Sequence, residues 1–362
     1  MTDPESVSAL SAEELAEAPK VLLHDHLDGG LRPATVIELA EETGYEGLPE
    51  TEEQALAQWF YDACNSGSLV RYLDTFEHTM GVMQTHDAIV RVAAEAVEDL
   101  ANDGVVYAEI RFAPELFTQR GLSLDQAVAA VCEGLREGSS GRNIVARALV
   151  DGMRQNNLVS QAFQAATVYR DHGVVGVDIA GPELGFLPSL HREAFGEASR
   201  ANMHITCHAG EADGYESIWE ALHVAGAERL GHGVRIADEV SEASGGGAPR
   251  LGRLAQYVLD RQIPLEVAPT SNLQTGIADT YAGHPIGVLH RIGFAVTVNT
   301  DNRLMSNCTT TSELAAVSDA FGWGWADVAR VEVNAMQAAF LPYEERERLL
   351  REQLVPFYAE HV

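Results

Sequence analysis

The stretch Val21–Gly30, VLLHDHLDGG, is an apolar run that ends in two histidines one residue apart. Side chains alternate between the two faces of a β-strand, so His24 and His26 point the same way and Asp28 continues that face. Two imidazoles on one face at the end of a strand can bind one metal ion. The stretch therefore predicts a strand that ends at a metal site, although the same spacing also fits a strand end with two surface histidines and a glycine turn.

Beyond this stretch the chain alternates between strand-like apolar runs and periodic helical segments. Strands are predicted at about 20–27, 105–112, 144–150, 174–179, 204–208, 229–232, 263–267 and 295–299. Repeated strand–helix alternation predicts a parallel sheet, and eight strands within 362 residues favour an α/β fold of the (β/α)8 TIM type. No Gly-x-Gly-x-x-Gly follows the first strand, which disfavours an open dinucleotide-binding sheet.

Extra helices are expected outside the barrel repeat, in an acidic lead-in at 1–18, within 51–80, and at about 311–320, 325–339 and 343–359. One of them carries an apolar stripe of five residues: Leu69, Tyr72, Leu73, Phe76 and Met80. Such a stripe is typical of a core face, or of a hydrophobic lid over a pocket. No internal repeat or linker divides the chain, so residues 1–362 are predicted to form a single domain.

Composition limits the partners. The formal net charge of -30 repels polyanions, which disfavours nucleic acid, anionic membranes and multiply charged phosphate substrates. No apolar run is long enough to cross a membrane, and the acidic N-terminus lacks the order of a signal peptide. We therefore expect a cytoplasmic protein, and the sequence leaves its oligomeric state open.

Histidines and acids recur where the predicted strands end. In a barrel of this type the carboxyl ends of the strands converge on one mouth. The polar residues expected there are His24, His26, Asp28, Glu109, Arg111, Asp178, Gly181, Glu183, His208, Glu211, His232, Asn272, Asp301 and Asn302. Core packing does not explain so many polar side chains at these positions.

Four of these residues form a donor set for zinc. His24, His26, His208 and Asp301 would supply three imidazoles and a carboxylate, and leave room for a water. A metal ion lowers the pKa of the water it binds from about 16 toward about 7, which makes a nucleophile at neutral pH. The fourth predicted strand contains no lysine, and Lys20 is the only lysine of the chain. A two-metal hydrolase whose ions share a modified lysine is therefore disfavoured, and we expect one Zn²⁺ per chain.

Two further residues suit proton chemistry near that metal. Glu211 follows His208 by three residues and could hold a proton and deliver it, although an acid in the first turn of a helix is the alternative reading. His232 lies between two glycines and could accept a proton from the water or fix its orientation. A buried, hydrogen-bonded structural histidine is the alternative there.

Taken together, the motifs resemble the adenosine deaminase family of the metal-dependent amidohydrolases. They are His-x-His-Leu-Asp-Gly at 24–29, Asp-x-Ala-Gly-x-Glu at 178–183, His-Ala-Gly-Glu at 208–211, Gly-His-Gly at 231–233, Pro-x-Ser-Asn at 269–272 and Asn-Thr-Asp at 299–301. They occur in the family's order, and the resemblance extends over nearly the whole chain from Pro19.

The resemblance implies a role for each matched residue. The zinc ligands would be His24, His26, His208 and Asp301, and the catalytic residues Glu211, His232 and Asp301. Glu211 would protonate purine N1, and His232 would assist the attacking hydroxide. Substrate contacts are implied for His26, Asp28 (ribose 5′-hydroxyl), Gly181 (purine N3) and Asn302. The stripe of Tyr72, Leu73 and Phe76 resembles the family's hydrophobic lid.

The chain departs from the family pattern at two positions. Pro182 stands where the family often has aspartate, and Asn302 replaces a common second aspartate that donates to purine N7. An Asn amide can donate a hydrogen bond to N7 without first binding a proton, so the second exchange is chemically tolerable. It could retune base preference and the pH profile.

The function implied is hydrolytic deamination of adenosine and 2′-deoxyadenosine to inosine and 2′-deoxyinosine plus ammonia, in purine salvage. Adenine, or a modified adenosine such as aminodeoxyfutalosine, is an alternative substrate, although a free base would leave Asp28 unpaired. A nucleoside-binding homologue without turnover is the alternative from another class. It is disfavoured because Glu211, His232 and the four ligands are all present.

Overall fold

The computed structural model describes residues 9–65, 67, 69–241 and 249–362. Its main sheet has eight strands whose spatial order follows the sequence. They are β1 (Lys20–His26), β2 (Val105–Phe112), β3 (Val145–Met153), β4 (Val174–Ala180), β5 (His204–Ala209), β6 (Arg229–His232), β9 (Leu265–Val267) and β10 (Val296–Val298). Neighbouring strands pair in parallel. The predicted (β/α)8 architecture is therefore confirmed.

The sheet closes where β1 meets the segment after β10. The contact is a single parallel bridge between Asp25 and Asp301. The N–H of His26 donates to the carbonyl of Asp301 at 2.7 Å, and the N–H of Asp301 donates to the carbonyl of His24 at 2.9 Å. The seam of the nearly closed barrel thus joins the two histidines of the first strand to the aspartate after the last one.

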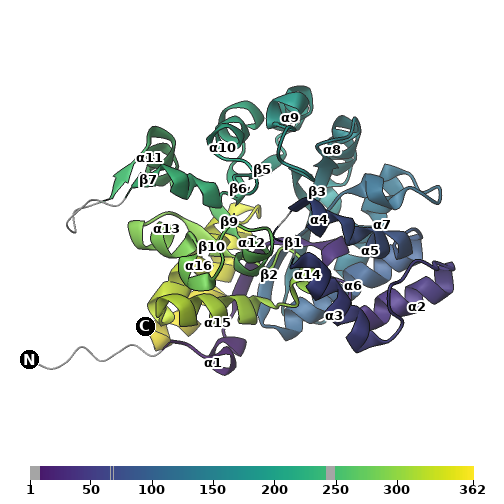
Figure 1. Ribbon diagram of the computed structural model, residues 1–362, viewed down its shortest axis with the longest axis horizontal. Coiled ribbons are helices and arrows are strands. Elements are labelled where there is room, and N and C mark those ends of the chain that lie inside the picture. Colours follow the sequence, from purple (N-terminus) through teal and green to yellow (C-terminus); the bar gives the residue numbers. More distant parts are fainter. Residues whose placement is uncertain (1–8, 66, 68, 242–248) are drawn as a thin grey trace, which may run out of the picture.

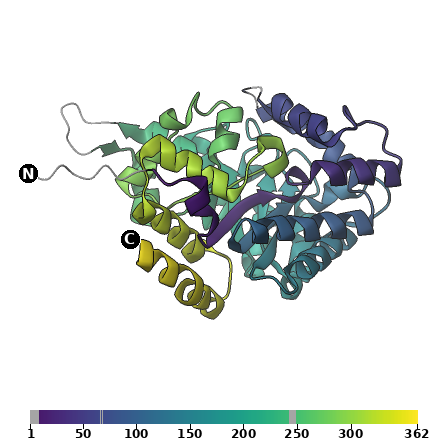
Figure 2. The ribbon, with the colours of Figure 1, turned by 90° about the horizontal axis from the view of Figure 1, so that it is seen from below.

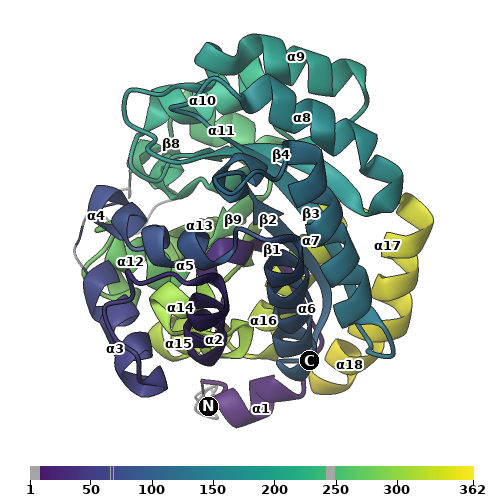
Figure 3. The same ribbon diagram turned by 90° about the vertical axis from the view of Figure 1, so that its right-hand side faces the viewer.

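Helices surround the strands, which lie near the centre of Figure 3. In chain order, and as labelled in Figure 1 and, for the last two, in Figure 3, they are α1 (Ala12–Ala16), α2 (Pro33–Thr43), α3 (Glu53–Cys64), α4 (Leu69–Asp74), α5 (Phe76–Val82), α6 (His86–Asn102), α7 (Leu124–Ser139), α8 (Val159–Val168), α9 (Arg192–Arg200), α10 (Tyr215–Glu220), α11 (Arg253–Asp260), α12 (Pro269–Gln274), α13 (Ile286–Ile292), α14 (Arg303–Ser306), α15 (Thr310–Phe321), α16 (Trp325–Ala338), α17 (Tyr343–Leu349) and α18 (Val355–His361). A short antiparallel pair, β7 (Val240–Ser241) and β8 (Arg250–Leu251), lies outside the barrel sheet.

Local sequence explains how these helices begin and pack. The side chain of Thr85 accepts the N–H of Ala88 at the start of α6, and Ser123 forms a capping box with Gln126 at the start of α7. The two helices pack closely because Gly134 on α7 has no side chain. A Cβ there would lie 2.4 Å from the carbonyl oxygen of Val90 on α6.

The extra helices occur close to their predicted positions. Of the acidic lead-in, residues 1–8 lie outside the described part of the chain, and α1 covers Ala12–Ala16. The C-terminal helices, yellow in Figure 2, reach β1, where the hydroxyl of Tyr358 donates to the carbonyl of Pro19 at 2.9 Å. In the described part of the chain, the helices are all too short or too polar to cross a lipid bilayer.

Two short helices at the barrel mouth were not predicted. Strands were predicted to end at about 267 and 299 with no helix directly after them, but α12 and α14 begin there. Pro269 occupies the first turn of α12, where a missing N–H costs nothing because the first N–H groups of a helix lack partners. Asn272 on α12 and Asn302 directly before α14 are both buried.

Candidate active site

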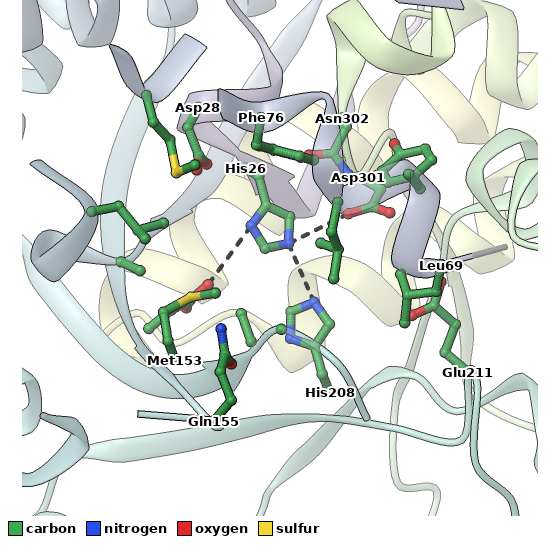
Figure 4. Close-up of a pocket in the computed structure, with 18 of the residues that line it drawn as sticks. His26, Asp28, Leu69, Phe76, Met153, Gln155, His208, Glu211, Asp301 and Asn302 are labelled. Atoms are coloured by element: carbon green, nitrogen blue, oxygen red, sulfur yellow. Dashed lines mark hydrogen bonds and ion pairs between the residues drawn. The ribbon is translucent and has the colours of Figure 1, made fainter. Parts of the chain in front are cut away.

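Four predicted ligands meet at the mouth of the barrel. His24 and His26 come from β1, His208 from β5 and Asp301 from the segment after β10, and one donor atom of each lies within 4.8 Å of the others. His26 Nε2 is 3.2 Å from His208 Nε2 and 3.4 Å from Asp301 Oδ1. These are dashed contacts of Figure 4. The fold therefore brings together the donor atoms of all four residues that the sequence predicted as metal ligands.

The protonation of these imidazoles fits a metal ion. His24 Nδ1 lies 2.9 Å from Glu266 Oε2, and His208 Nδ1 lies 2.7 Å from Asp178 Oδ2. A carboxylate only accepts, so each Nδ1 carries the hydrogen and each Nε2 presents a lone pair to the cluster.

The lone pairs of this cluster face one another. His24 Nε2 is buried and makes no hydrogen bond within the described residues, although it lies 3.3 Å from Asp301 Oδ1. Lone pairs converging on a carboxylate repel unless a cation lies among them. The cluster therefore has the donor atoms and the orientation to bind a metal ion, and a bound cation would relieve the repulsion between its lone pairs.

Sequence reasoning missed Glu266 and Asp151, which face the histidine Nδ1 atoms. Glu266 is fully buried on β9, and its only signal was a charged residue inside the apolar run at 263–267. Asp151 lies near the end of β3, the one strand end for which no site residue was proposed. Its Oδ2 is 3.7 Å from His26 Nδ1, and neither of its oxygens has a hydrogen-bond partner in the described structure.

The backbone at the site is left-handed at two functional residues. The φ angles of His232 and Asp301 are 60° and 58°, a region that residues other than glycine seldom adopt. Gly231 packs closely against the ligands, because a Cβ there would lie 3.0 Å from His208 Cα and 3.2 Å from His24 Cε1. The Gly-His-Gly motif thus places the His232 ring against the imidazole rings of His24 and His208.

A pocket extends from this cluster and includes the predicted substrate-contacting residues. Its walls contain His26, Asp28, Gly181, Glu211, His232, Asp301 and Asn302. The apolar stripe of α4 and α5 also faces it, with Leu69, Tyr72, Leu73, Phe76 and Met80 in the wall. In Figure 4, Asp28 and Glu211 lie on opposite sides of His26, with Leu69 and Phe76 beside the same cavity. One side of the pocket is therefore apolar and the other is lined by groups that donate or accept protons.

Glu211 is buried in the pocket wall and has a raised pKa. Burial, together with the nearby charge of Asp301, raises its pKa to about 7. Its Oε2 lies 3.7 Å from His232 Nε2. A carboxyl group with this pKa holds a proton at neutral pH and can still release it. The interpretation of Glu211 as an ordinary first-turn acid does not explain its burial within the pocket wall.

Asp28 and Asn302 each have one buried side-chain oxygen that accepts no hydrogen bond from the described residues. Burial raises the pKa of Asp28 to about 7. Among the described residues, neither Asp28 Oδ1 nor Asn302 Oδ1 has a hydrogen-bond partner, and both are buried. Both residues line the pocket. Buried polar atoms of this kind are expected to bond to a ligand or to water.

Comparison with known proteins agrees with this geometry. The model of the family "Adenosine deaminase" matches residues 19–354. Adenosine deaminase 1 of Streptomyces coelicolor is 54% identical over 364 residues, covering 99% of this chain and 92% of that protein. Adenosine deaminase of Mycobacteroides abscessus is 50% identical over 355 residues, covering 97% and 98%. Among solved structures, the adenine deaminase of Arthrobacter aurescens aligns with a TM-score of 0.81 at 25% identity, covering 95% of this chain and 100% of that one. The chain belongs to the adenosine deaminase family.

Proposed function

We propose that this chain catalyses the hydrolytic deamination of adenosine and 2′-deoxyadenosine, giving inosine or 2′-deoxyinosine and ammonia in purine salvage. The observation that carries the proposal is the meeting of a protonatable Glu211 with the His24, His26, His208 and Asp301 cluster in one pocket. Relatives with adenosine deaminase in their names, at 50% and 54% identity, support the same reaction. The family match over residues 19–354 supports a single catalytic domain.

His24, His26, His208 and Asp301 would hold one Zn²⁺ per chain. The ion, when bound, supplies a water of lowered pKa and stabilises negative charge on oxygen. Glu266 and Asp178 orient His24 and His208 through their Nδ1 hydrogens. Ser271 donates to Asp301 Oδ2 at 2.6 Å and fixes the carboxylate that faces His232.

The proton donor is Glu211. In its neutral form it gives a proton to purine N1 while water adds to C6, because protonation at N1 makes C6 electrophilic. The C6 amino group takes one proton of the water and leaves as ammonia, the other proton of the water regenerates neutral Glu211, and a 6-oxopurine with its hydrogen on N1 remains. Burial of Glu211 makes this transfer possible near pH 7, where an exposed glutamate would already be ionised.

Substrate recognition would use the remaining polar groups of the pocket. Asp28 contacts the ribose 5′-hydroxyl, the backbone N–H of Gly181 contacts N3, and the Asn302 amide donates to N7. The stripe on α4 and α5 covers the base and excludes water, which strengthens these polar contacts. The buried, unpartnered oxygen of Asp28 supports a ribosyl substrate over a free base. The cytoplasmic location stays a prediction.

An absorbance assay tests the proposal. Purified, zinc-loaded protein is offered adenosine, 2′-deoxyadenosine and adenine in parallel, with Glu211→Gln as the control variant. We expect the adenosine absorbance to fall only with the two nucleosides and only in the wild type. Turnover of adenine alone would remove the ribose role of Asp28. Inactivity with all three, with zinc bound, would direct the search to modified adenosines and then to a binding protein without turnover.

A further inference from the structure

A buried hydrogen-bonded chain leads away from the pocket behind His232. His232 Nδ1 lies 3.1 Å from Asn272 Nδ2, and Asn272 Oδ1 lies 3.2 Å from His284 Nε2. The last group in the chain is a backbone amide, because the N–H of Ile286 donates to His284 Nδ1 at 3.0 Å. His232, Asn272 and His284 are all buried. The pocket wall includes His232, whereas the other two lie behind it.

The backbone amide fixes the direction of every bond in this chain. A nitrogen that accepts from an N–H carries no hydrogen, so His284 is the neutral tautomer with its hydrogen on Nε2. Burial, which lowers the pKa of His284 to about 3, keeps that ring neutral. His284 Nε2–H must then meet the oxygen of Asn272, which turns the Asn272 NH₂ group toward His232. His232 Nδ1 is therefore an acceptor.

The alternative tautomer of His232, with its hydrogen on Nδ1, leaves two hydrogen-bond donors facing each other at one buried contact of the chain. A hydrogen on His232 Nδ1 would face the NH₂ group of Asn272. Rotating the Asn272 amide would move the clash to His284 Nε2–H. Shifting the His284 hydrogen to Nδ1 would set it against the N–H of Ile286, which the start of α13 holds in place. Each alternative leaves two donors facing each other in a site closed to water.

We propose that Asn272 and His284 are positioning residues that hold His232 in the tautomer with its hydrogen on Nε2. His232 Nε2 faces the reaction side of the pocket, 3.7 Å from Glu211 Oε2 and 4.0 Å from Asp301 Oδ2. In this tautomer Nε2 donates a hydrogen bond to the attacking oxygen and has no lone pair with which to take its proton. The inference rests on the proposed deamination and selects orientation of the water, over proton abstraction, as the role of His232.

Neutron diffraction from crystals of the zinc-loaded wild-type protein tests the assignment directly. We expect deuterium on Nε2 and none on Nδ1 of both His232 and His284. Deuterium on Nδ1 of His232 would overturn the proposal. This measurement needs no variant and no turnover. A protein that shows the expected deuterium but leaves adenosine unchanged would contradict the proposed function while the tautomer assignment stood.

The kinetics of an Asn272 variant test whether the hydrogen-bonded chain behind His232 affects the reaction. Asn272→Asp presents only acceptors to both rings and should move the His232 hydrogen to Nδ1. We expect kcat to fall by about 100-fold or more, because an Nε2 without a hydrogen cannot donate to the attacking oxygen, and losing one such donor costs about 100- to 1000-fold in kcat. KM for adenosine and the zinc content should stay close to those of the wild type. An unchanged kcat in this variant would overturn the proposal.

A pair of His284 variants separates the effect of the hydrogen bond to Asn272 from the effect of side-chain packing. His284→Leu removes the donor to Asn272, whereas His284→Gln keeps an N–H that can replace it. We expect the leucine variant to lose kcat and the glutamine variant to recover most of it. His290→Leu is the matched control, because His290 on α13 is also a buried histidine but bonds to Asp327. Equal losses of kcat in all three variants would show that the effect is structural and would overturn the proposal.

Discussion

Glu183 holds the backbone of Glu211 in place: Glu183 Oε2 accepts the Glu211 N–H at 3.1 Å. The same oxygen accepts the N–H groups of Ala212 at 2.6 Å and Asp213 at 2.9 Å, and the other oxygen accepts that of Gly210 at 2.6 Å. Glu183 follows β4, whereas this turn follows β5. One carboxylate therefore fixes the turn that presents the proposed proton donor.

Replacing Glu183 should impair catalysis without removing any group that touches the substrate. In Glu183→Gln an NH₂ group faces backbone N–H groups, so the turn must shift. A shift of about 1 Å in the donor can cost about 100-fold in rate, and unpaired buried N–H groups cost about 1–3 kcal/mol of stability. Steady-state kinetics and thermal unfolding measure both effects. Glu216→Gln, an exposed acid in the same region, is the control, and a wild-type kcat in Glu183→Gln would contradict the role.

The pH dependence of kcat/KM should report the proton on Glu211. Because burial raises its pKa from 4.5 to about 7, the carboxyl group is protonated below that pH and ionised above it. We expect kcat/KM to be highest below about 7 and to fall as the pH rises, about tenfold per unit once Glu211 is ionised.

Asp28 needs a control because its pKa is also raised to about 7 by burial. The Asp28→Asn variant removes that carboxyl group and keeps a polar side chain. We expect it to raise KM for adenosine while the fall of kcat/KM at high pH persists. If the fall disappears in this variant, Asp28 and not Glu211 is the group that must carry the proton.

Metal removal should destabilise the protein as well as inactivate it. The Nε2 lone pairs of His24 and His208 face the cluster beside Asp301, and a cation removes that repulsion. Excess ligand stabilises by about 2.7 kcal/mol when its concentration is 100 times Kd. We expect the unfolding temperature of chelator-treated protein to rise with added Zn²⁺. The increase should be lost in His208→Ala, and elemental analysis that found two ions per chain would contradict a single site.

Some residues of this site could be predicted from the sequence and others could not. His24 and His26 were predictable, because strand periodicity and the end of an apolar run place both side chains together. Glu266 was not, because a buried charge in the middle of a strand is indistinguishable in sequence from an error in the strand assignment. Its partners Arg111 and Arg229 come from strands 155 and 37 residues away, and only the barrel brings them within 2.6 Å.

The same limit applies behind His232. The Gly-His-Gly motif indicated that His232 faces the site, but the direction of its hydrogen depends on Asn272 and His284. Asn272 reaches the ring because α12 begins directly after β9, and that early helix start was not predicted. His284 belongs to none of the sequence motifs, and its bond to the Ile286 N–H depends on where α13 begins. Hydrogen positions thus follow from element boundaries, which sequence patterns locate poorly.

Asp151 should strengthen metal binding through His26. Its carboxylate is fully buried, and Oδ2 lies 3.7 Å from His26 Nδ1. Carboxylate partners of metal-bound histidines contribute about 10- to 100-fold to affinity. We expect Asp151→Asn to raise the Kd for Zn²⁺ by this factor in a chelator competition assay. Asp171→Asn, an exposed acid at the other end of the barrel, should leave Kd unchanged. An unaltered Kd in Asp151→Asn would show that His26 needs no such partner.

Glu266 should contribute to folding independently of the metal. Its two oxygens accept from His24 Nδ1 at 2.9 Å, Arg111 at 2.6 Å, Arg229 at 2.6 Å and the hydroxyl of Thr206 at 2.8 Å. Removing one partner of a buried ion pair costs about 3–5 kcal/mol, because the remaining charges stay buried. We expect Glu266→Gln to lower the free energy of unfolding by about that amount in urea titrations.

The acid sensitivity of the same residue provides a second, independent measurement. Burial acts to raise the pKa of Glu266, but the charges of Arg111 and Arg229 outweigh it and hold the pKa well below 4.5. The unfolded chain therefore binds this proton more readily, so the stabilisation is complete above about pH 4.5 and is lost as the pH falls toward the folded-state pKa. Titrations of chelator-treated protein separate this effect from metal release. If metal-free wild type and Glu266→Gln have the same unfolding free energy at pH 7, Glu266 serves only to orient His24.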